Sequence, residues 1–255
     1  MIKASEKASK ILIRDFGEIE NLQVSKKGPS DFVTNSDLKA EKIILEELIK
    51  ARPNYSIISE ENGIKINKDK NNTWIIDPID GTINFLHGIP HFAISIALKS
   101  KNEIVSGLIF DPIKNEMFFA EKGSGAFLNN SRIRVSNKKN LKESMLVTGG
   151  PRRSSKKRDS IFKEYNNISN IVDIPIRKFG SAALDLANVA CGRFDGFWQW
   201  ELSYWDIAAG LIIIEESGGF VDFLEKDEKA LVKKNIIATN SKIHQELKNV
   251  LEKKY

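Results

Sequence analysis

The stretch from Trp74 to Phe85 reads Trp-Ile-Ile-Asp-Pro-Ile-Asp-Gly-Thr-Ile-Asn-Phe, and it sets the fold of the residues around it. Its first three residues are apolar and predict a buried strand. We expect that strand to end at Asp77-Pro78, because proline has no backbone N–H to donate to a sheet. Asp77 and Asp80 lie three residues apart, and a turn at Pro78 would let both carboxylates face one point. A hard cation such as Mg2+ requires oxygen ligands arranged in this way.

A helix that begins at Gly81-Thr82 would present free backbone N–H groups beside the two carboxylates. Such a helix start makes an anion site next to a cation site. The same residues are also good turn chemistry, because Asp caps turns with its side chain and Gly accepts a positive φ, and an ordinary surface loop is the more frequent outcome for five such residues alone. Two further acidic clusters at expected strand and helix ends favour the cation site.

The composition of the 255-residue chain is that of an ordinary globular protein, with 41% hydrophobic residues and therefore enough for a sizeable core. Its single cysteine, Cys191, excludes an intramolecular disulfide framework. No apolar run reaches the roughly 18 to 20 residues of a membrane span, and the N-terminus has no apolar signal core, so we expect a cytoplasmic protein without a membrane partner. The net charge of +5 comes largely from lysine and supports nucleic-acid binding only weakly.

The first half of the chain, about 1–140, is expected to be α+β. Helical spacing of apolar residues predicts a helix over 2–20, and a run of N-cap residues at 34–37 precedes a second helix. A strand is expected to end at Glu60-Glu61, and residues 92–120 alternate like an antiparallel meander. These features predict a sheet faced by the two long helices.

The second half, about 141–255, has an α/β pattern. A strand is expected over 171–176, and a helix of small and apolar residues opens at Gly180-Ser181. Asp206 is expected as the N-cap of an apolar helix. The basic stretch from Arg152 to Arg158 is in most proteins a solvated loop, and nucleic-acid binding is the minority interpretation. No internal repeat or linker is visible, so one domain over the whole chain is expected.

Four acids, Glu60, Asp77, Asp80 and Asp206, come from three separate segments. If they converge, mutual repulsion raises their pKa values unless cations lie between them. No cysteine pair or closely spaced histidine pair offers a zinc site. Two or three Mg2+ ions beside a helix N-terminus would form a site for phosphate hydrolysis. Because a phosphate-binding Gly-x-x-x-x-Gly-Lys loop and a serine nucleophile elbow are both absent, we expect direct attack of water on a phosphate monoester.

With these residues assembled, the chain resembles the inositol monophosphatase family along nearly its whole length. The matching segments, which hold both acidic motifs in the family's order and spacing, are Asp31 to Glu41, Ser59 to Asn62, Trp74 to Phe85, Phe179 to Ala183 and Trp205 to Gly210. Residues 86–95 look especially like the bacterial inositol-1-monophosphatases. The resemblance implies a layered α-β-α-β-α sandwich of the sugar-phosphatase type, Mg2+-dependent hydrolysis of myo-inositol 1-phosphate or a related polyol phosphate, a homodimer and inhibition by lithium.

The resemblance also implies the roles of single residues. The implied metal ligands are Glu60, Asp77, the carbonyl of Ile79, Asp80 and Asp206. Asp37 and Thr82 would orient the attacking water, with Glu60 as a further catalytic residue, and the loop containing Lys26 would close over the site. The implied substrate-binding residues are Asp80, Gly81, Thr82, Gly180, Ser181, Ala182, Gln199 and Asp206.

One position departs from the family pattern. Seven residues before Asp206 the inositol-specific members usually carry glutamate, whereas this chain has Gln199, which still accepts a hydrogen bond but has no charge. Glu201, two residues on, is a candidate to compensate. Relatives that hydrolyse fructose 1,6-bisphosphate, histidinol phosphate, NADP or adenosine 3',5'-bisphosphate keep the choice of substrate open.

A binding role is the second hypothesis. Some bacterial relatives also act in RNA metabolism by contacting the transcription machinery, and the stretch from Arg152 to Arg158 is the local support for RNA or transcription partners here. A catalytically dead relative is the least favoured interpretation, because every metal-ligand position that the motifs define carries the expected acid.

Overall fold

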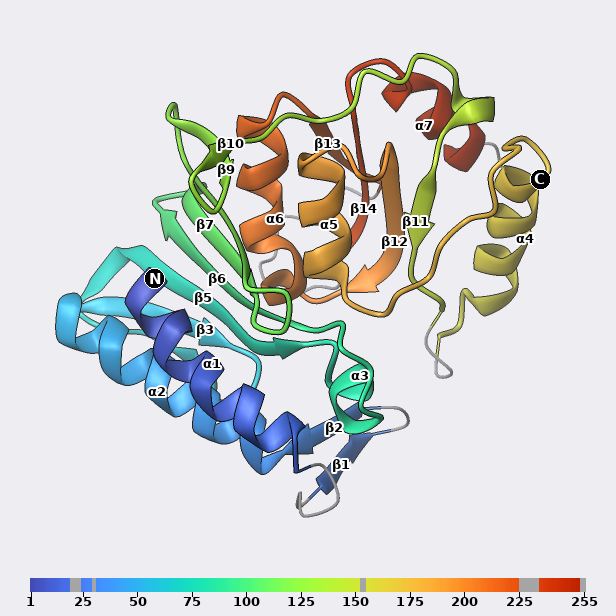
Figure 1. Ribbon diagram of the computed structural model, residues 1–255. Helices are drawn as coiled ribbons and strands as arrows, with labels where there is room; N and C mark the ends of the chain where they lie inside the picture. Colours follow the sequence, from blue (N-terminus) through green and yellow to red (C-terminus); the bar gives the residue numbers. More distant parts are fainter. Residues whose placement is uncertain (19–23, 29–30, 152–154, 225–233, 253–255) are drawn as a thin grey trace.

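The computed structural model describes residues 1–18, 24–28, 31–151, 155–224 and 234–252, with the backbone alone for 24–28 and 31–33. The described elements stack in five layers, α-β-α-β-α (Figure 1). The predicted layered α+β sandwich is thereby confirmed.

The first layer holds the helices α1 (Ile2–Phe16) and α2 (Asn35–Ala51), which pack on one face of an eight-stranded sheet (Figure 1). Strand order in that sheet is β10-β9-β8-β7-β6-β5-β3-β4, and its neighbours are antiparallel except for the parallel pair of β3 and β5. Its strands are β3 (Tyr55–Ser59), β4 (Gly63–Lys65), β5 (Asp69–Asp80), β6 (Ala93–Ser100), β7 (Glu103–Asp111), β8 (Glu116–Glu121), β9 (Gly125–Leu128) and β10 (Ser131–Arg132). Strands β6 to β10 confirm the predicted antiparallel meander.

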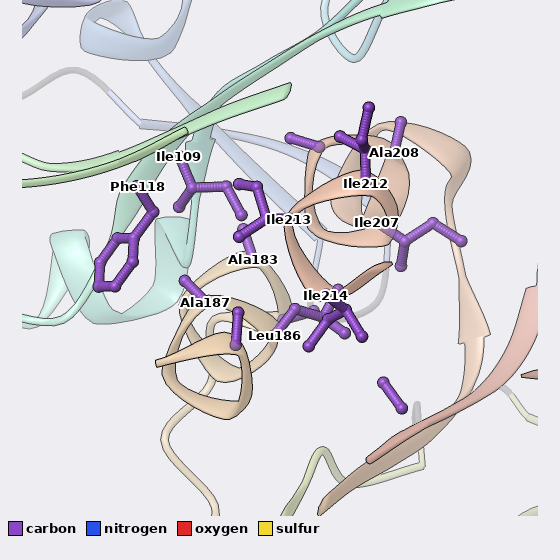
Figure 2. Packing of buried hydrophobic residues seen from close by; sticks show 14 of the residues in the cluster. Ile109, Phe118, Ala183, Leu186, Ala187, Ile207, Ala208, Ile212, Ile213 and Ile214 are labelled. Atoms are coloured by element: carbon purple, nitrogen blue, oxygen red, sulfur yellow. The ribbon is translucent and has the colours of Figure 1, made fainter. Parts of the chain in front are cut away.

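The middle layer consists of α5 (Ala182–Ala190) and α6 (Tyr204–Glu216), which lie between the two sheets (Figure 1). Ala183 and Ala187 of α5 and Ile213 of α6 lie beside Ile109 and Phe118 of the larger sheet (Figure 2). The helices approach closely because α6 has Gly210 at the contact, where an added Cβ would lie 2.4 Å from the side chain of Leu186. This tight packing holds α5 and α6 against each other, and α5 begins beside the end of β5, where the Ala183 N–H donates to Asp80.

The last two layers are a four-stranded sheet and two outer helices (Figure 1). The sheet has the order β11-β12-β14-β13, with strands β11 (Leu146–Thr148), β12 (Gly196–Leu202), β13 (Phe220–Phe223) and β14 (Lys234–Thr239). The outer helices α4 (Arg158–Ser169) and α7 (His244–Glu252) cover the face that carries Trp198 and Ile237. Along β12, side chains alternate between this face and the α5–α6 face, so Phe197 belongs to the middle core.

Short elements complete the described chain. They are the hairpin of β1 (Val24–Gly28) with β2 (Asp31–Thr34), the five-residue helix α3 (Thr82–Leu86) and a 3-10 turn at Leu141–Glu143. None of the helices in the described ranges is long and apolar enough to cross a membrane.

The first helix is shorter than the predicted 2–20, because α1 ends at Phe16. Two predictions about strands are also wrong. Strand β5 does not end at Asp77-Pro78 but continues to Asp80, because its pairing with β6 shifts register between Asp77 and Asp80 and the resulting bulge accommodates the missing N–H of Pro78. Residues 171–176 form no strand, and this stretch meets β11 only through an isolated bridge at Arg177.

Candidate active site

Asp77 lies at the centre of the acidic residues that the sequence singled out. It is 2% exposed, and its Oδ1 accepts a 3.0 Å hydrogen bond from the backbone N–H of Ile79 inside the β5 bulge. Burial raises the pKa of Asp77 well above its ordinary value, and the negative charges of Glu60, Asp80 and Asp206 raise it further. The structure therefore brings all four acids into one electrostatic neighbourhood.

Asp80 is held at the N-terminus of α5. Its Oδ2 accepts 2.6 Å hydrogen bonds from the Ser181 hydroxyl and from the Ala183 backbone N–H. Burial, followed by the charge of Asp206, raises the pKa of Asp80 to about 7, although these two hydrogen bonds oppose the rise. Ser181 is itself the N-cap of α5 and is 1% exposed, so in this structure its hydroxyl serves Asp80.

Asp206 lies in the first turn of α6, two residues inside it. The N-cap is Ser203, and the Ser203 backbone N–H donates to Asp206 Oδ2 at 2.8 Å, which completes a capping box. The predicted N-cap role of Asp206 is therefore wrong by three positions. The capping box nevertheless fixes its carboxylate at the helix start, where it meets Asp77 and Asp80.

Asp37 and Thr82, the predicted water-orienting pair, lie together. Asp37 occupies the capping box of α2, where its Oδ2 accepts from the Thr34 backbone N–H at 2.8 Å and from the Thr34 hydroxyl at 2.5 Å. The Thr82 hydroxyl lies 3.0 Å from the Ile79 carbonyl and 3.4 Å from Asp37 Oδ1. Because a hydroxyl has one hydrogen, it can donate to only one of these two acceptors at a time. Burial raises the pKa of Asp37 to about 6.

Two of the predicted glycines have backbone conformations that favour glycine. Gly81 has φ +101°, and an added Cβ would lie 3.1 Å from the His91 carbonyl. Gly180 has φ +87° and adjoins Asn84, whose Nδ2 donates 2.7 Å hydrogen bonds to the carbonyls of His91 and Phe179. Asn84 thus links the segment after β5 to the loop before α5. Ala182, the first residue of α5, is 6% exposed.

Glu41 is a functional candidate that the sequence analysis missed. It is 0% exposed on α2, and its carboxylate accepts four hydrogen bonds from the turn that contains Glu60. The available signal was its place in the apolar stripe of the helix with Ala40 and Ile44, because an acid in such a stripe needs buried donors.

Asp185 is the second missed residue. It is 1% exposed on α5, and among the residues that the structure describes its Oδ1 has no hydrogen-bond partner. Burial raises the pKa of Asp185 well above its ordinary value, and the charge of Asp80 adds to the rise. Its place in a helix of small apolar residues was again the available signal.

The rim beside α6 consists of the last residues of β12. The Gln199 side chain lies against the backbone of Gly149, where an added Cβ would be 2.2 Å from the Gln199 amide. The pairing of β12 with β14 shifts register between Gln199 and Leu202, and Glu201 adopts φ +59° with its N–H bonded to Asn235 Oδ1 at 2.8 Å. The predicted Lys26 lies in β1, and its side chain is outside the described residues.

The donor set around Asp77 suits a hard cation. It consists of carboxylates, and oxygen ligands are those that Mg2+ prefers. The predicted carbonyl ligand, that of Ile79, lies 3.0 Å from the Thr82 hydroxyl. In the described ranges no three Asp, Glu, His or Cys side chains stand close enough to make a finished metal cage. Because electrostatic effects on a pKa extend beyond ligand distance, we interpret the acids as facing one space without closing on it. The raised pKa values of Asp77 and Asp80 reflect buried carboxylates that repel one another, and a bound cation would offset that repulsion.

Comparison with known proteins identifies relatives that match nearly the whole chain. The sequence pattern of the inositol monophosphatase family matches residues 1–254. An inositol-1-monophosphatase of Caulobacter vibrioides is 48% identical over 97% of each chain, and a Nus factor SuhB of Pasteurella multocida is 39% identical over 98% of this chain and 94% of its own.

Among solved structures, the extragenic suppressor protein suhB of Bartonella henselae superposes with a TM-score of 0.94 at 49% identity, over 100% of this chain and 98% of its own. Identity of this size over the whole length covers every element that carries the acidic residues. The chain belongs to the inositol monophosphatase family, a family of phosphatases that is generally metal-dependent.

Proposed function

We propose that this protein is a Mg2+-dependent phosphomonoesterase that hydrolyses myo-inositol 1-phosphate, or a closely related polyol phosphate, to the alcohol and inorganic phosphate. The observation that carries the proposal is the gathering of Glu60, Asp80 and Asp206 around the buried Asp77, since burial and the neighbouring negative charges raise the pKa values of Asp77 and Asp80. Glu60, Asp77, Asp80, Asp206 and the Ile79 carbonyl would hold two or three Mg2+ ions. Bound there, the ions would supply Lewis-acid activation of water and of the phosphate.

The side chains of Asp37 and Thr82 would then orient the attacking water and accept its proton. Thr82 Oγ1 accepts a hydrogen bond from that water and donates its own hydrogen to Asp37 Oδ1, 3.4 Å away. A carboxyl group with a pKa of about 6 is ionised near neutral pH and accepts that hydrogen bond. The P–O bond to the water oxygen forms as the ester P–O bond breaks. The proton that the attacking water loses passes through Thr82 to Asp37. The departing alkoxide takes a proton from a solvent water, and Asp37 later returns its proton to the solvent.

Separate groups of the protein would bind the phosphate and the alcohol part of the substrate. The backbone N–H groups of Gly81 and Thr82 would bind the phosphate, and Gly180, Ser181, Ala182 and Gln199 would surround the alcohol. Gln199 belongs to the rim rather than to the acidic cluster, and its neutral amide supports a polyol but gives no charge to select inositol.

A substrate panel tests the choice of substrate. Phosphate release is measured at saturating Mg2+ with inositol 1-phosphate, fructose 1,6-bisphosphate, histidinol phosphate, NADP and adenosine 3',5'-bisphosphate. We expect the highest kcat/KM for inositol 1-phosphate and inhibition by lithium. A higher kcat/KM for another substrate would overturn the inositol assignment and leave the phosphatase assignment in place. Sedimentation of the purified protein tests the homodimer that family membership supports.

A second function, RNA binding, is favoured by the relatives named Nus factor SuhB and by the basic stretch before α4. Residues 152–154 of that stretch lie outside the described residues. Of the others, Lys157 Nζ lies 5.8 Å from the Trp200 ring centroid, and the Arg158 guanidinium lies 5.4 Å from that of Phe162.

Alanine at Lys156, Lys157 and Arg158 should weaken binding of a single-stranded RNA in low salt and leave phosphate release unchanged. The matched control replaces Lys65, Lys68 and Lys70 by alanine, which removes the same charge from exposed positions on β4, on β5 and between them. Equal weakening by both triple variants would reduce the effect to net charge, and absence of RNA binding by the parent protein would remove this function.

A further inference from the structure

We propose that Glu41 is a positioning residue that sets the place of Glu60 and thereby the affinity of the site for its cation. The proposal rests on the proposed function, because it takes Glu60 as a metal ligand. Glu41 lies one helical turn after Asp37 on α2, and both side chains are buried.

The contacts of Glu41 surround Glu60 on both sides. Its Oε1 accepts from the Ser59 hydroxyl at 2.7 Å, from the Asn62 backbone N–H at 3.1 Å and from Asn62 Nδ2 at 2.5 Å. Its Oε2 accepts from the Glu61 backbone N–H at 2.9 Å. The residues directly before and after Glu60 are thus bound to one carboxylate, while the Glu60 N–H donates to the Ile76 carbonyl at 3.2 Å. The backbone of Glu60 is therefore fixed from two elements, α2 and β5.

A purely structural role would explain a buried carboxylate with four donors, since a buried charge needs such partners. Two features of the surroundings of Glu41 are not explained by a purely structural role. The turn that Glu41 binds places Glu60 next to Asp77, because the parallel pairing of β3 with β5 sets Ser59 opposite Ile76 and the Glu60 N–H donates to the Ile76 carbonyl. The same helix face also carries Asp37, whose Oδ1 faces Thr82. Residues four apart share one face of a helix, so α2 sets the spacing between the water-orienting pair and the Glu60 turn.

The packing of α2 makes it a rigid reference for that spacing. Ala40, Ile44 and Leu48 are buried on the same side of the helix as Glu41, in the core that α2 shares with α1 and the larger sheet. The turn itself, residues 60–63, contains no apolar side chain, and its nearest buried apolar residues are Ile57 and Ile58 in β3 before it. Glu41 anchors the turn with hydrogen bonds in place of apolar contact.

The test replaces Glu41 by glutamine, which keeps the size but offers one acceptor oxygen and turns an N–H towards one of the present donors. Calorimetric titration with Mg2+ should show a dissociation constant raised by about 10- to 100-fold, the range for residues that orient metal ligands. The kcat at saturating Mg2+ should stay within about threefold of the parent, because Glu41 does not touch the reacting atoms. Loss of correctly folded protein alone would lower kcat in proportion and leave the dissociation constant unchanged.

The matched control is Glu46→Gln, the same chemical change on the exposed side of the same helix, and it should leave the Mg2+ dissociation constant within about twofold. If Glu41→Gln gives no cooperative thermal transition, Ser59→Ala decides the matter. This variant removes one of the four donors, and the loss of one hydrogen bond to a charged group should raise the dissociation constant by about tenfold. An unchanged dissociation constant in the folded variant overturns the proposal.

Amide hydrogen exchange provides a readout that does not depend on the metal. In Glu41→Gln the amides of residues 60–62 should exchange faster than in the parent, whereas those of 44–51 should not change. If the parent protein itself binds no Mg2+ and releases no phosphate, the proposed function fails, and the exchange rates alone judge the positioning role. Unchanged exchange at 60–62 would then overturn it.

Discussion

The acidic cluster and the rim beside it meet at the start of α6 but are built in opposite ways. In the cluster, Asp80 is tied to α5, Asp206 is tied to its capping box, and Asp77 is bonded within its own strand. At the rim, Gln199 rests on the backbone of a glycine, and Glu201 adopts a φ that few residues other than glycine adopt. The difference teaches that the fold specifies the charged centre through buried hydrogen bonds and leaves the rim to single side chains.

The largest effect is expected from a change at the centre. Asp80→Asn keeps the size of the side chain but removes a charge, so it should lower kcat/KM for every substrate by about 1000-fold or more, equivalent to roughly 4 kcal/mol of transition-state stabilisation. Phosphate-release kinetics measure this, with Asp159→Asn on the exposed start of α4 as the control. Turnover near the parent level in Asp80→Asn would sink the metal assignment.

The next effect concerns Thr82, which connects the centre to α2. Thr82→Val keeps the shape and removes the hydroxyl, so kcat should fall by about 100-fold, the lower range for a group that handles a proton. Thr82→Ser restores the hydroxyl and should recover most of the activity. If the valine variant is as active as the serine variant, Thr82 has no part in orienting water.

The buried negative charge of the acidic cluster should also make the stability of the metal-free protein depend on pH. Asp80 has a folded-state pKa of about 7, above its unfolded value, so its folded form binds a proton that the unfolded chain does not hold near neutral pH, and stability falls as pH rises through that value. We expect the Tm to rise by a few °C from pH 8 to pH 6.5, since about 1 kcal/mol shifts the Tm of a chain this size by about 2–4 °C. Below about pH 6.5 the buried His91, with its pKa lowered to about 4, opposes the trend.

Differential scanning fluorimetry at a series of pH values measures the dependence of the Tm on pH. Mg2+ at pH 8 should raise the Tm and weaken its dependence on pH, because the cation replaces the protons. Asp80→Asn should weaken that dependence without metal, and the part that stays belongs to Glu164, whose pKa burial also raises to about 7. A Tm that falls between pH 8 and pH 6.5 would contradict the repulsion among the buried carboxylates.

A change at the rim should alter the preference among substrates and leave Mg2+ binding at the acidic cluster unchanged. Gln199→Glu restores the charge that inositol-specific relatives usually carry, so it should raise the preference for inositol 1-phosphate over the other substrates by about tenfold, the size of one charged hydrogen bond. The Mg2+ dissociation constant should stay within about twofold. If both parameters moved together, the separation between cluster and rim would be wrong.

The smallest effect is expected at Glu201. Its φ of +59° costs about 1 kcal/mol or more for a residue with a Cβ, and glycine removes this strain while keeping the N–H that donates to Asn235. Glu201→Gly should therefore increase the free energy of unfolding by about 0.5 kcal/mol, after the larger chain entropy of glycine is counted. Urea denaturation measures the change. A loss of inositol 1-phosphate turnover in this variant would show that Glu201 compensates for Gln199.

The sequence was sufficient for the layered fold and for the phosphatase class, and both predictions are confirmed. Periodicity placed α1, α2 and the meander, because their apolar stripes follow from burial on one face. It could not place the end of β5, since a bulge that admits Pro78 depends on the partner strand β6. The expected strand at 171–176 failed because its apolar residues reach the core beside α4 without a neighbour to pair with over its length.

Site residues that lie close together in sequence could be predicted. Buried acids on helix faces could not, because their hydrogen-bond partners and neighbouring charges come from other elements. The pair Asp77 and Asp80 was visible as a motif, whereas Glu41 and Asp185 interrupt apolar helix faces and acquire meaning only from the groups packed against them. The roles assigned to metal ligands and substrate contacts stay predictions. The division near residue 140, the homodimer and the cytoplasmic location do so too.

The central claim is that the acids around Asp77 hold the cations that hydrolyse a phosphate monoester. Its most direct test is the initial rate of phosphate release from inositol 1-phosphate while Mg2+ is titrated back into chelator-treated protein. We predict no turnover in the chelator, a saturable recovery with Mg2+ and suppression of that recovery by lithium. Turnover that persists undiminished in excess chelator would contradict the account.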